Sequence, residues 1–312
     1  MAERLHHITR KGVTGMADFG RVITAMVTPM DKSLAVDYAK AAALAKRLVE
    51  QGSDGLVVCG TTGESPTLSD EEKIRLFRTV RDAVGARAAV IAGTGTYDTA
   101  HSIHLTKEAE KAGCDGVLLV NPYYNKPSQE GLYRHFRAIA ESTRLPVMLY
   151  NIQGRTSVNC EPATIARLAE VPNIVAVKEA SGSLDQMSQI RKLTPPAFRL
   201  YSGDDSLTLP LLSVGGHGIV SVAAHIAGRE IKEMIIAFEA GDVRKALALH
   251  LRLWPLFKVL FITTNPTPVK AALAMTGFDA GGLRLPMVEV TPNEREQIAA
   301  VIKALALTAV PA

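Results

Sequence analysis

The run Ile174-Val175-Ala176-Val177-Lys178 indicates a buried strand, and it ends on a lysine. It is short and rich in β-branched residues, and Val171-Pro172-Asn173 supplies turn residues before it. A short apolar run that follows a turn is typical of a strand buried on both faces of a parallel sheet. Leu145-Pro146 precedes a similar run, Val147-Met148-Leu149-Tyr150, which ends on a tyrosine. The two runs together predict neighbouring strands of a buried sheet.

The lysine that closes the first run has two interpretations. Lysine is rarely buried, because removing an ammonium group from water is unfavourable unless the group becomes neutral. Lys178 either ends the strand and extends its ammonium to water, or it is held neutral as a nucleophile that forms a Schiff base with a carbonyl compound. The run alone does not separate these interpretations, so the rest of the chain must.

Strand-like runs alternate with helical patterns along the chain. Ile74-Phe77-Val80-Val84 has helical periodicity, and Ser69 with Glu72 forms a capping box before it. Strand, helix, strand repeated eight times requires right-handed crossovers and predicts a TIM (β/α)8 barrel. An open doubly wound sheet is the alternative, but it usually carries a glycine fingerprint in its first turn, where this chain has Thr28-Pro29-Met30-Asp31. The eight runs are residues 22–27, 55–59, 88–92, 116–120, 147–150, 174–178, 198–201 and 218–222.

The segment after residue 222 reads as helix, with apolar faces such as Ile231-Met234-Ile235-Phe238 and Ile298-Val301-Ile302-Leu305. One helix completes the barrel, so the others predict a C-terminal helical appendage. No linker-like stretch intervenes. We expect a disordered N-terminal extension over 1–18, the barrel over 19–235 and the appendage over 236–312. The extension lacks the apolar core of a secretory signal.

Composition narrows the class of protein. Hydrophobic residues make up 47% and charged residues 21% of the 312 residues, which is typical of a soluble globular protein. The net charge is only +4, and lysine and arginine residues are interspersed with aspartate and glutamate along the chain. We therefore expect no nucleic-acid partner. No apolar stretch approaches the roughly 20 residues of a membrane span. The three cysteines, Cys59, Cys114 and Cys160, lack metal-like spacing and favour a reducing, cytoplasmic location without a metal site.

The carboxyl ends of the strands build the active site of such a barrel. Period-two alternation places Ala176 and Lys178 on one face of the sixth strand. Val175 and Val177 then lie on the other face, against the outer helices. We therefore expect Lys178 to point inward, beside a small residue that leaves room for a substrate.

The same alternation applies to the second and fifth strands. In the fifth strand it places Met148 and Tyr150 on one face. In the second strand it places Val57, Cys59 and Thr61 on one face. The lysine, the tyrosine and the threonine are therefore expected to converge at one mouth of the barrel.

Each polar residue at this mouth has a structural alternative. Gly60-Thr61-Thr62-Gly63 is either a tight turn or a nest of N–H groups and hydroxyls for a small carboxylate. Tyr150 is either a core tyrosine with a satisfied hydroxyl or a proton shuttle. Arg155 is either a solvated surface charge or a bidentate clamp for a carboxylate. Asp204 and Asp205 have no partner at metal-ligand spacing, so we interpret them as structural.

Taken together, five stretches resemble the dihydrodipicolinate synthase / N-acetylneuraminate lyase family of class I, pyruvate-dependent aldolases. The resemblance runs from about Gly20 to the C-terminus, and it is closer to the dihydrodipicolinate synthase branch. Neuraminate lyases typically carry serine-threonine where this chain has Thr61-Thr62, and they generally lack an arginine at the position of Arg155. The stretches are Gly60-Thr61-Thr62-Gly63-Glu64-Ser65, Asn121-Pro122-Tyr123-Tyr124-Asn125-Lys126-Pro127-Ser128, Tyr150-Asn151 with Arg155-Thr156, Val177-Lys178-Glu179-Ala180, and Asn265-Pro266-Thr267-Pro268-Val269-Lys270.

The resemblance implies condensation of pyruvate with L-aspartate 4-semialdehyde in lysine and diaminopimelate biosynthesis. By that resemblance Lys178 forms the imine with pyruvate, and Thr61 and Thr62 orient it. Tyr150 transfers protons and is linked through Thr61 to Tyr124 of a neighbouring subunit.

Further implications concern the second substrate and the assembly. Arg155 would hold the carboxylate of the semialdehyde, and Gly203 and Val220 would line the pocket. The borrowed tyrosine implies self-association, and the family is typically a homotetramer, a dimer of dimers. No metal or organic cofactor is implied, because the imine is itself the electron sink.

Two departures from the family pattern stand out. Gln153-Gly154 replaces a proline and a small residue, so we expect a looser loop before Arg155, which leaves the aldehyde preference open. Lysine-inhibited relatives carry an acidic residue, an asparagine and histidines at the feedback site. The corresponding positions here are His101, Tyr97, Asp70 and Lys73, which predict weak or absent inhibition by lysine.

Three other functions compete with this one. Another pyruvate aldolase of the same family, acting on a sugar acid or an unrelated aldehyde, shares the fold and the lysine. A non-catalytic paralogue is disfavoured because the complete set of site residues is present. A phosphate-binding or flavin barrel is weaker still, because Asp204 and Asp205 stand where an anion would need glycine-rich amides. We interpret Gly215-Gly216-His217-Gly218 as the tight turn that leads into the eighth strand.

Overall fold

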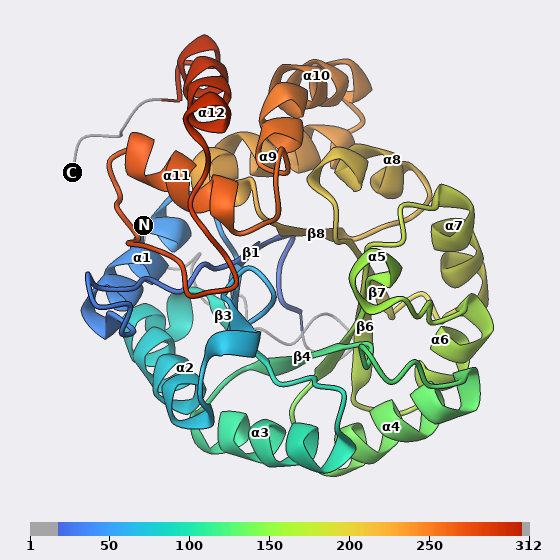
Figure 1. Cartoon of the computed structure of the whole chain (residues 1–312). Helices are drawn as coiled ribbons and strands as arrows, with labels where there is room; N and C mark the ends of the chain where they lie inside the picture. Colours follow the sequence, from blue (N-terminus) through green and yellow to red (C-terminus); the bar gives the residue numbers. More distant parts are fainter. Residues whose placement is uncertain (1–17, 308–312) are drawn as a thin grey trace, which may run out of the picture.

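The computed structural model describes residues 18–307 of the chain. Within this part, eight parallel strands close into a barrel in chain order (Figure 1). The predicted TIM barrel is therefore confirmed. The strands are β1 (Val22–Ala25), β2 (Gly55–Val58), β3 (Ala89–Gly93), β4 (Gly116–Val120), β5 (Val147–Asn151), β6 (Ile174–Glu179), β7 (Arg199–Ser202) and β8 (Gly218–Ser221).

Helices surround the strands, and most of them begin with a capping side chain. The predicted capping box is present at α2 (Asp70–Val84), where Ser69 and Glu72 exchange hydrogen bonds. Among the helices of the described residues, none is long and apolar enough to span a membrane. The other helices of the ring are α1 (Tyr38–Glu50), α3 (Thr99–Lys111), α4 (Gln129–Glu141), α6 (Pro162–Leu168), α7 (Leu184–Leu193), α8 (Thr208–Ser213) and α9 (Ala224–Glu239).

A helical appendage follows the ring, as predicted. It consists of α10 (Val243–Val259), α11 (Thr267–Met275) and α12 (Pro292–Ala304), and Figure 1 shows α10 and α12 outside the ring of helices. The predicted boundary between residues 235 and 236 falls inside α9. Of the predicted extension 1–18, residues 1–17 lie outside the described residues, and Asp18 accepts a hydrogen bond from the Gly20 N–H.

Two apolar clusters fill the fold, one between barrel and helices and one inside the barrel. Ala176, Met148 and Tyr150 belong to the inner cluster, as the alternation predicts. Val177 belongs to the outer cluster, also as predicted.

For two residues, the prediction of whether the side chain points into the barrel or toward the outer helices was wrong. Val175 packs in the inner cluster, because the pairing of β5 with β6 steps from Ile174 to Ala176 and leaves Val175 as the extra residue of a register shift. Cys59 packs in the outer cluster. The strand ends one residue earlier, at Val58, and Cys59 has a φ of 56°, so strand alternation no longer applies to it.

The turn before β8 and the aspartates after β7 have structural roles, as expected. Gly215 has a φ of +89°, and a Cβ at Gly218 would lie 2.1 Å from the carbonyl oxygen of Arg21. The Asp205 carboxylate accepts hydrogen bonds from the N–H groups of Val222 and Ala223. Asp204 caps the short helical turn η3 (Asp205–Leu207). The glycines shape the entry to β8, and the contacts of Asp205 fix the backbone just after its end.

Candidate active site

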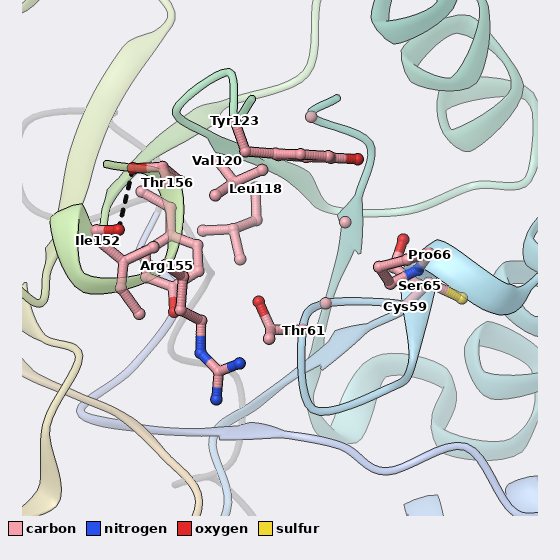
Figure 2. Close-up of a pocket in the computed structure, with 14 residues that line it drawn as sticks. Cys59, Thr61, Ser65, Pro66, Leu118, Val120, Tyr123, Ile152, Arg155 and Thr156 are labelled. Atoms are coloured by element: carbon pink, nitrogen blue, oxygen red, sulfur yellow. Dashed lines mark hydrogen bonds between the residues drawn. The ribbon is translucent and has the colours of Figure 1, made fainter. Parts of the chain in front are cut away.

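A cavity of about 220 Å³ opens at the carboxyl ends of β2, β3, β4 and β5. Its polar lining includes Thr61, Tyr123, Tyr150 and Arg155. Figure 2 shows the side chains of Thr61 and Arg155 projecting into the same open space. Three predicted site residues, those at 61, 150 and 155, therefore share one cavity at the expected end of the barrel.

Lys178 does not itself line this cavity, but it lies directly against Tyr150, which does. The two residues are direct partners in the pairing of β5 with β6, and Lys178 Nζ lies 4.0 Å from the centroid of the Tyr150 ring. Lys178 is 6% exposed and Tyr150 is 5% exposed, so both groups are shielded from bulk water. The arrangement places a primary amine directly against a phenol.

Gly203 and Val220, which the resemblance assigns to the pocket wall, are not among the residues that line the cavity, so their pocket-lining roles stay predictions. A Cβ added at Gly203 would lie 3.2 Å from Lys178 Cε and 2.6 Å from Ala180 Cβ. The bare glycine therefore provides the space that the lysine stem occupies. Val220 belongs to the inner cluster of the barrel, on the strand that closes it.

The residue that follows Lys178 in β6 carries a buried carboxylate. Glu179 is fully buried, and it accepts hydrogen bonds from the Asn151 and Gln186 side-chain amides. Asn151 and Glu179 directly follow Tyr150 and Lys178 in their strands and are also register partners. This outward-facing polar layer fixes the two strand ends that carry the tyrosine and the lysine.

The loop after β2 is a tight turn. The Gly63 N–H donates to the Gly60 carbonyl at 3.0 Å, and the Glu64 N–H donates to the Thr61 carbonyl at 3.1 Å. Thr62 is buried, and its hydroxyl oxygen accepts a hydrogen bond from Asn265 Nδ2 at 2.9 Å. Thr61 thus faces the cavity while Thr62 is anchored to the appendage.

Arg155 is carried by a helical turn. At the end of the segment α5 (Gln153–Thr156), the Ser157 N–H donates a hydrogen bond to the Gln153 carbonyl at 2.8 Å. Arg155 Nη2 donates to the carbonyl oxygen of Asn265 at 3.4 Å. A Cβ at Gly154 would meet no atom within 4 Å, so the loop has space around it.

Tyr124, which the resemblance assigns to the proton relay, does not line the cavity of its own chain. Tyr124 is 93% exposed and has a φ of 74°. Its neighbour Tyr123 lines the cavity and contacts Tyr97 edge to face, with ring centroids 5.2 Å apart. Burial raises the pKa of Tyr123 above its ordinary value. The contribution of Tyr124 to a neighbouring subunit stays a prediction.

Three residues near the site were missed as individual contributors by the sequence analysis. Lys270 Nζ donates to Glu64 Oε1 at 2.6 Å, and both side chains are at most 3% exposed. Burial lowers the pKa of Lys270. Asn265 is the third. The signal for Lys270 was present, because it interrupts an apolar helix much as Lys178 closes an apolar strand.

The positions that correspond to the feedback site form an ion cluster. The Asp70 carboxylate lies 2.8 Å from His101 Nε2 and 3.8 Å from Lys73 Nζ. Lys73 is buried, whereas Tyr97 is 55% exposed. The carboxylate is thus already paired with groups of the same chain.

Comparisons with known proteins agree with this geometry. The family model of the Dihydrodipicolinate synthetase family matches residues 18–305. A protein of Desulforudis audaxviator named 4-hydroxy-tetrahydrodipicolinate synthase is 63% identical over 286 residues, which cover 92% of this chain and 97% of that protein.

Solved structures give the same result. Dihydrodipicolinate synthase of Bacillus anthracis superposes with a TM-score of 0.91 at 51% identity, over 95% of this chain and 100% of that chain. The enzyme of Cyanidioschyzon merolae, solved with lysine bound, superposes with a TM-score of 0.92 at 51% identity, over 93% of this chain and 99% of that chain.

Proposed function

The chain belongs to the dihydrodipicolinate synthetase family of lyases, and on this premise we propose that it condenses pyruvate with L-aspartate 4-semialdehyde through an imine on Lys178. The product is 4-hydroxy-tetrahydrodipicolinate, an intermediate of lysine and diaminopimelate biosynthesis. The observation that carries the proposal is the contact between Lys178 and Tyr150, 4.0 Å from amine to ring centroid, beside a cavity that also holds Thr61 and Arg155.

The reaction begins at the lysine amine. The unprotonated Nζ of Lys178 attacks C2 of pyruvate, the N–C2 bond forms, and the ketone oxygen leaves as water. Loss of a proton from the pyruvate methyl group gives an enamine, and its carbon attacks the aldehyde. The amino group of the semialdehyde then attacks C2, closes the ring and releases Lys178.

The chain provides separate groups for the two carboxylates. Thr61 and Thr62 bind the carboxylate of pyruvate through their hydroxyls and through N–H groups of the turn. Arg155 binds that of the semialdehyde, because its planar guanidinium matches a carboxylate in bidentate fashion. Gly203 and Val220 line the pocket around the imine. These roles are those that the resemblance implies, and the position of Thr61 and Arg155 in one cavity supports them.

Tyr150 supplies proton transfer next to the imine. Tyr124 extends this relay from a neighbouring subunit through Thr61, which is consistent with its exposure on the isolated chain. The proposal therefore includes a homotetramer, a dimer of dimers, in which each dimer completes two sites. We also propose a cytoplasmic location, since the three cysteines are free and buried.

The test is a coupled assay. Purified protein is given pyruvate and aspartate semialdehyde, and the product is followed by NADPH oxidation in the presence of the downstream reductase. A robust rate that Lys178→Ala abolishes supports the proposal. No rate with this aldehyde rejects the substrate assignment.

Borohydride trapping then separates the remaining functions. If pyruvate is trapped on Lys178 without turnover of the semialdehyde, the protein is a pyruvate aldolase with another aldehyde substrate. If neither turnover nor trapping occurs, the chain is a non-catalytic paralogue.

A further inference from the structure

Asn265 joins the two groups to which the proposed function assigns the substrate carboxylates. Its side-chain Nδ2 donates to the hydroxyl oxygen of Thr62 at 2.9 Å, across 203 residues of sequence. Its main-chain carbonyl accepts from Arg155 Nη2 at 3.4 Å. Asn265 is 5% exposed and Thr62 is 3% exposed, so the first contact is made without competition from bulk water.

The direction of the first hydrogen bond is important for substrate binding. The amide N–H of Asn265 occupies a lone pair of the Thr62 oxygen. The hydroxyl proton of Thr62 is therefore left to donate elsewhere. A carboxylate is an acceptor without protons of its own, so a threonine fixed as a donor suits it.

A second observation indicates that the asparagine at position 265 does not serve the stability of the fold. Asn265 Oδ1 is buried, and it has no hydrogen-bond partner among the described residues. A buried polar atom without a partner destabilises a fold, and such atoms in native proteins often mark functional positions. An apolar side chain of similar volume would remove that unpaired oxygen.

We propose that Asn265 is a positioning residue that sets Thr62 as a hydrogen-bond donor for pyruvate and holds Arg155 for the second substrate. This inference rests on the proposed function and deepens it. The C-terminal appendage thereby contributes to both substrate sites, although Asn265 does not line the cavity.

The test measures KM for each substrate in Asn265→Leu, which removes the amide and keeps the volume. We expect KM for pyruvate to rise about five- to tenfold, as the loss of one oriented hydrogen bond predicts. KM for the semialdehyde should rise less, because the main-chain carbonyl remains. kcat should change less than the pyruvate KM.

A double-mutant cycle shows whether the effect passes through Thr62. Adding Asn265→Leu to Thr62→Val should raise the pyruvate KM no further, because the hydroxyl is already absent. Adding it to Thr62→Ser, which retains the hydroxyl, should raise it as in the wild type. Additive effects with Thr62→Val would overturn the proposal.

Thr291→Ala is the matched control. Thr291 caps α12 of the same appendage by accepting a hydrogen bond from the Glu294 N–H. Its loss should lower Tm and leave both KM values unchanged. If Asn265→Leu also lowers only Tm, its role is structural and the proposal fails.

Two further outcomes are separable. If Asn265→Leu does not fold, Asn265→Ser is measured against the same criteria. If the wild-type enzyme itself does not turn over the substrate pair, the proposed function fails, and the result is distinct from failure of this inference.

Discussion

Tyr150 and Lys178 are direct register partners on the neighbouring parallel strands β5 and β6, with Lys178 Nζ 4.0 Å from the centroid of the Tyr150 ring. Both side chains point into the barrel because each occupies the inward position of its strand. Pairing within the sheet, rather than a flexible loop, therefore sets the distance between amine and phenol. Groups placed on strands hold such a distance more tightly than groups on loops.

Tyr150→Phe tests the proton-transfer role. The substitution keeps the ring against Lys178 and removes only the hydroxyl. We expect kcat to fall about 100-fold or more, as is typical for a lost general acid–base group. Borohydride should still trap pyruvate on Lys178, because the nucleophile remains. An unchanged kcat would show that another group transfers the proton.

Gly203→Ala tests the space around the lysine. The added methyl group would lie 3.2 Å from Lys178 Cε and 2.6 Å from Ala180 Cβ, so the lysine stem or the strand must shift. We expect slower imine formation and a loss of about 1–3 kcal/mol in the free energy of unfolding. The measurements are the rate of borohydride trapping and a urea titration.

Gly154→Ala is the control for that substitution. The new methyl group meets no atom within 4 Å, and it restricts the unfolded chain. We expect the rate to be retained and the free energy of unfolding to rise by about 0.4–1 kcal/mol. Equal losses in both variants would indicate a general effect of replacing glycine.

Period-two alternation could predict the inward positions of Lys178 and Tyr150, because it depends only on local strand geometry. It fails at Val175 and Cys59, where a register shift and a left-handed residue interrupt the alternation. Such interruptions depend on the partner strand and on the following turn. They cannot be read from one run of residues.

The contribution of the appendage could not be predicted from the sequence in the same way. Asn265 and Lys270 reach Thr62 and Glu64 across 203 and 206 residues. The resemblance included their segment as a motif and assigned it no role. Contacts of this range depend on how α11 packs on the barrel, and no local periodicity specifies that packing.

Lys270→Met tests the buried ion pair beneath the site loop. Glu64 would keep a buried carboxylate without its cation, and Lys270 Nζ now lies 2.6 Å from Glu64 Oε1. We expect a loss of about 3–5 kcal/mol in the free energy of unfolding. The double variant Glu64→Gln, Lys270→Met should recover part of that loss, because no buried charge remains. A double variant as unstable as the sum of the single variants would contradict this.

His225 predicts a pH dependence of stability. Burial lowers its pKa from 6.5 to about 4, and its Nε2 accepts from the Val27 N–H at 3.1 Å. Between pH 6.5 and 4 the unfolded chain binds a proton that the folded protein does not. Stability from this group is therefore present above pH 6.5 and is lost as the pH falls toward 4, by about 3 kcal/mol at most.

The measurement compares wild type with His225→Gln by urea unfolding across this range. The advantage of the wild type should shrink as the pH falls. Asp205 acts in the opposite sense, because burial raises its pKa from 3.8 to about 6, and the folded protein then binds its proton more tightly. The comparison between the two proteins cancels that contribution, since Asp205 is present in both. A constant difference across the range would contradict the prediction.

Inhibition by lysine should be weak or absent. An amino-acid effector needs a free carboxylate for its ammonium group, but Asp70 is already 2.8 Å from His101 Nε2 and 3.8 Å from Lys73 Nζ. Lys73 adds a buried positive charge that repels the incoming ammonium. Steady-state rates measured with increasing lysine should stay near the uninhibited value into the millimolar range. The double variant His101→Glu, Lys73→His, which supplies a carboxylate and removes the permanent charge, should become more sensitive. Potent inhibition of the wild-type enzyme by micromolar lysine would refute the prediction, because these contacts would then not block the site.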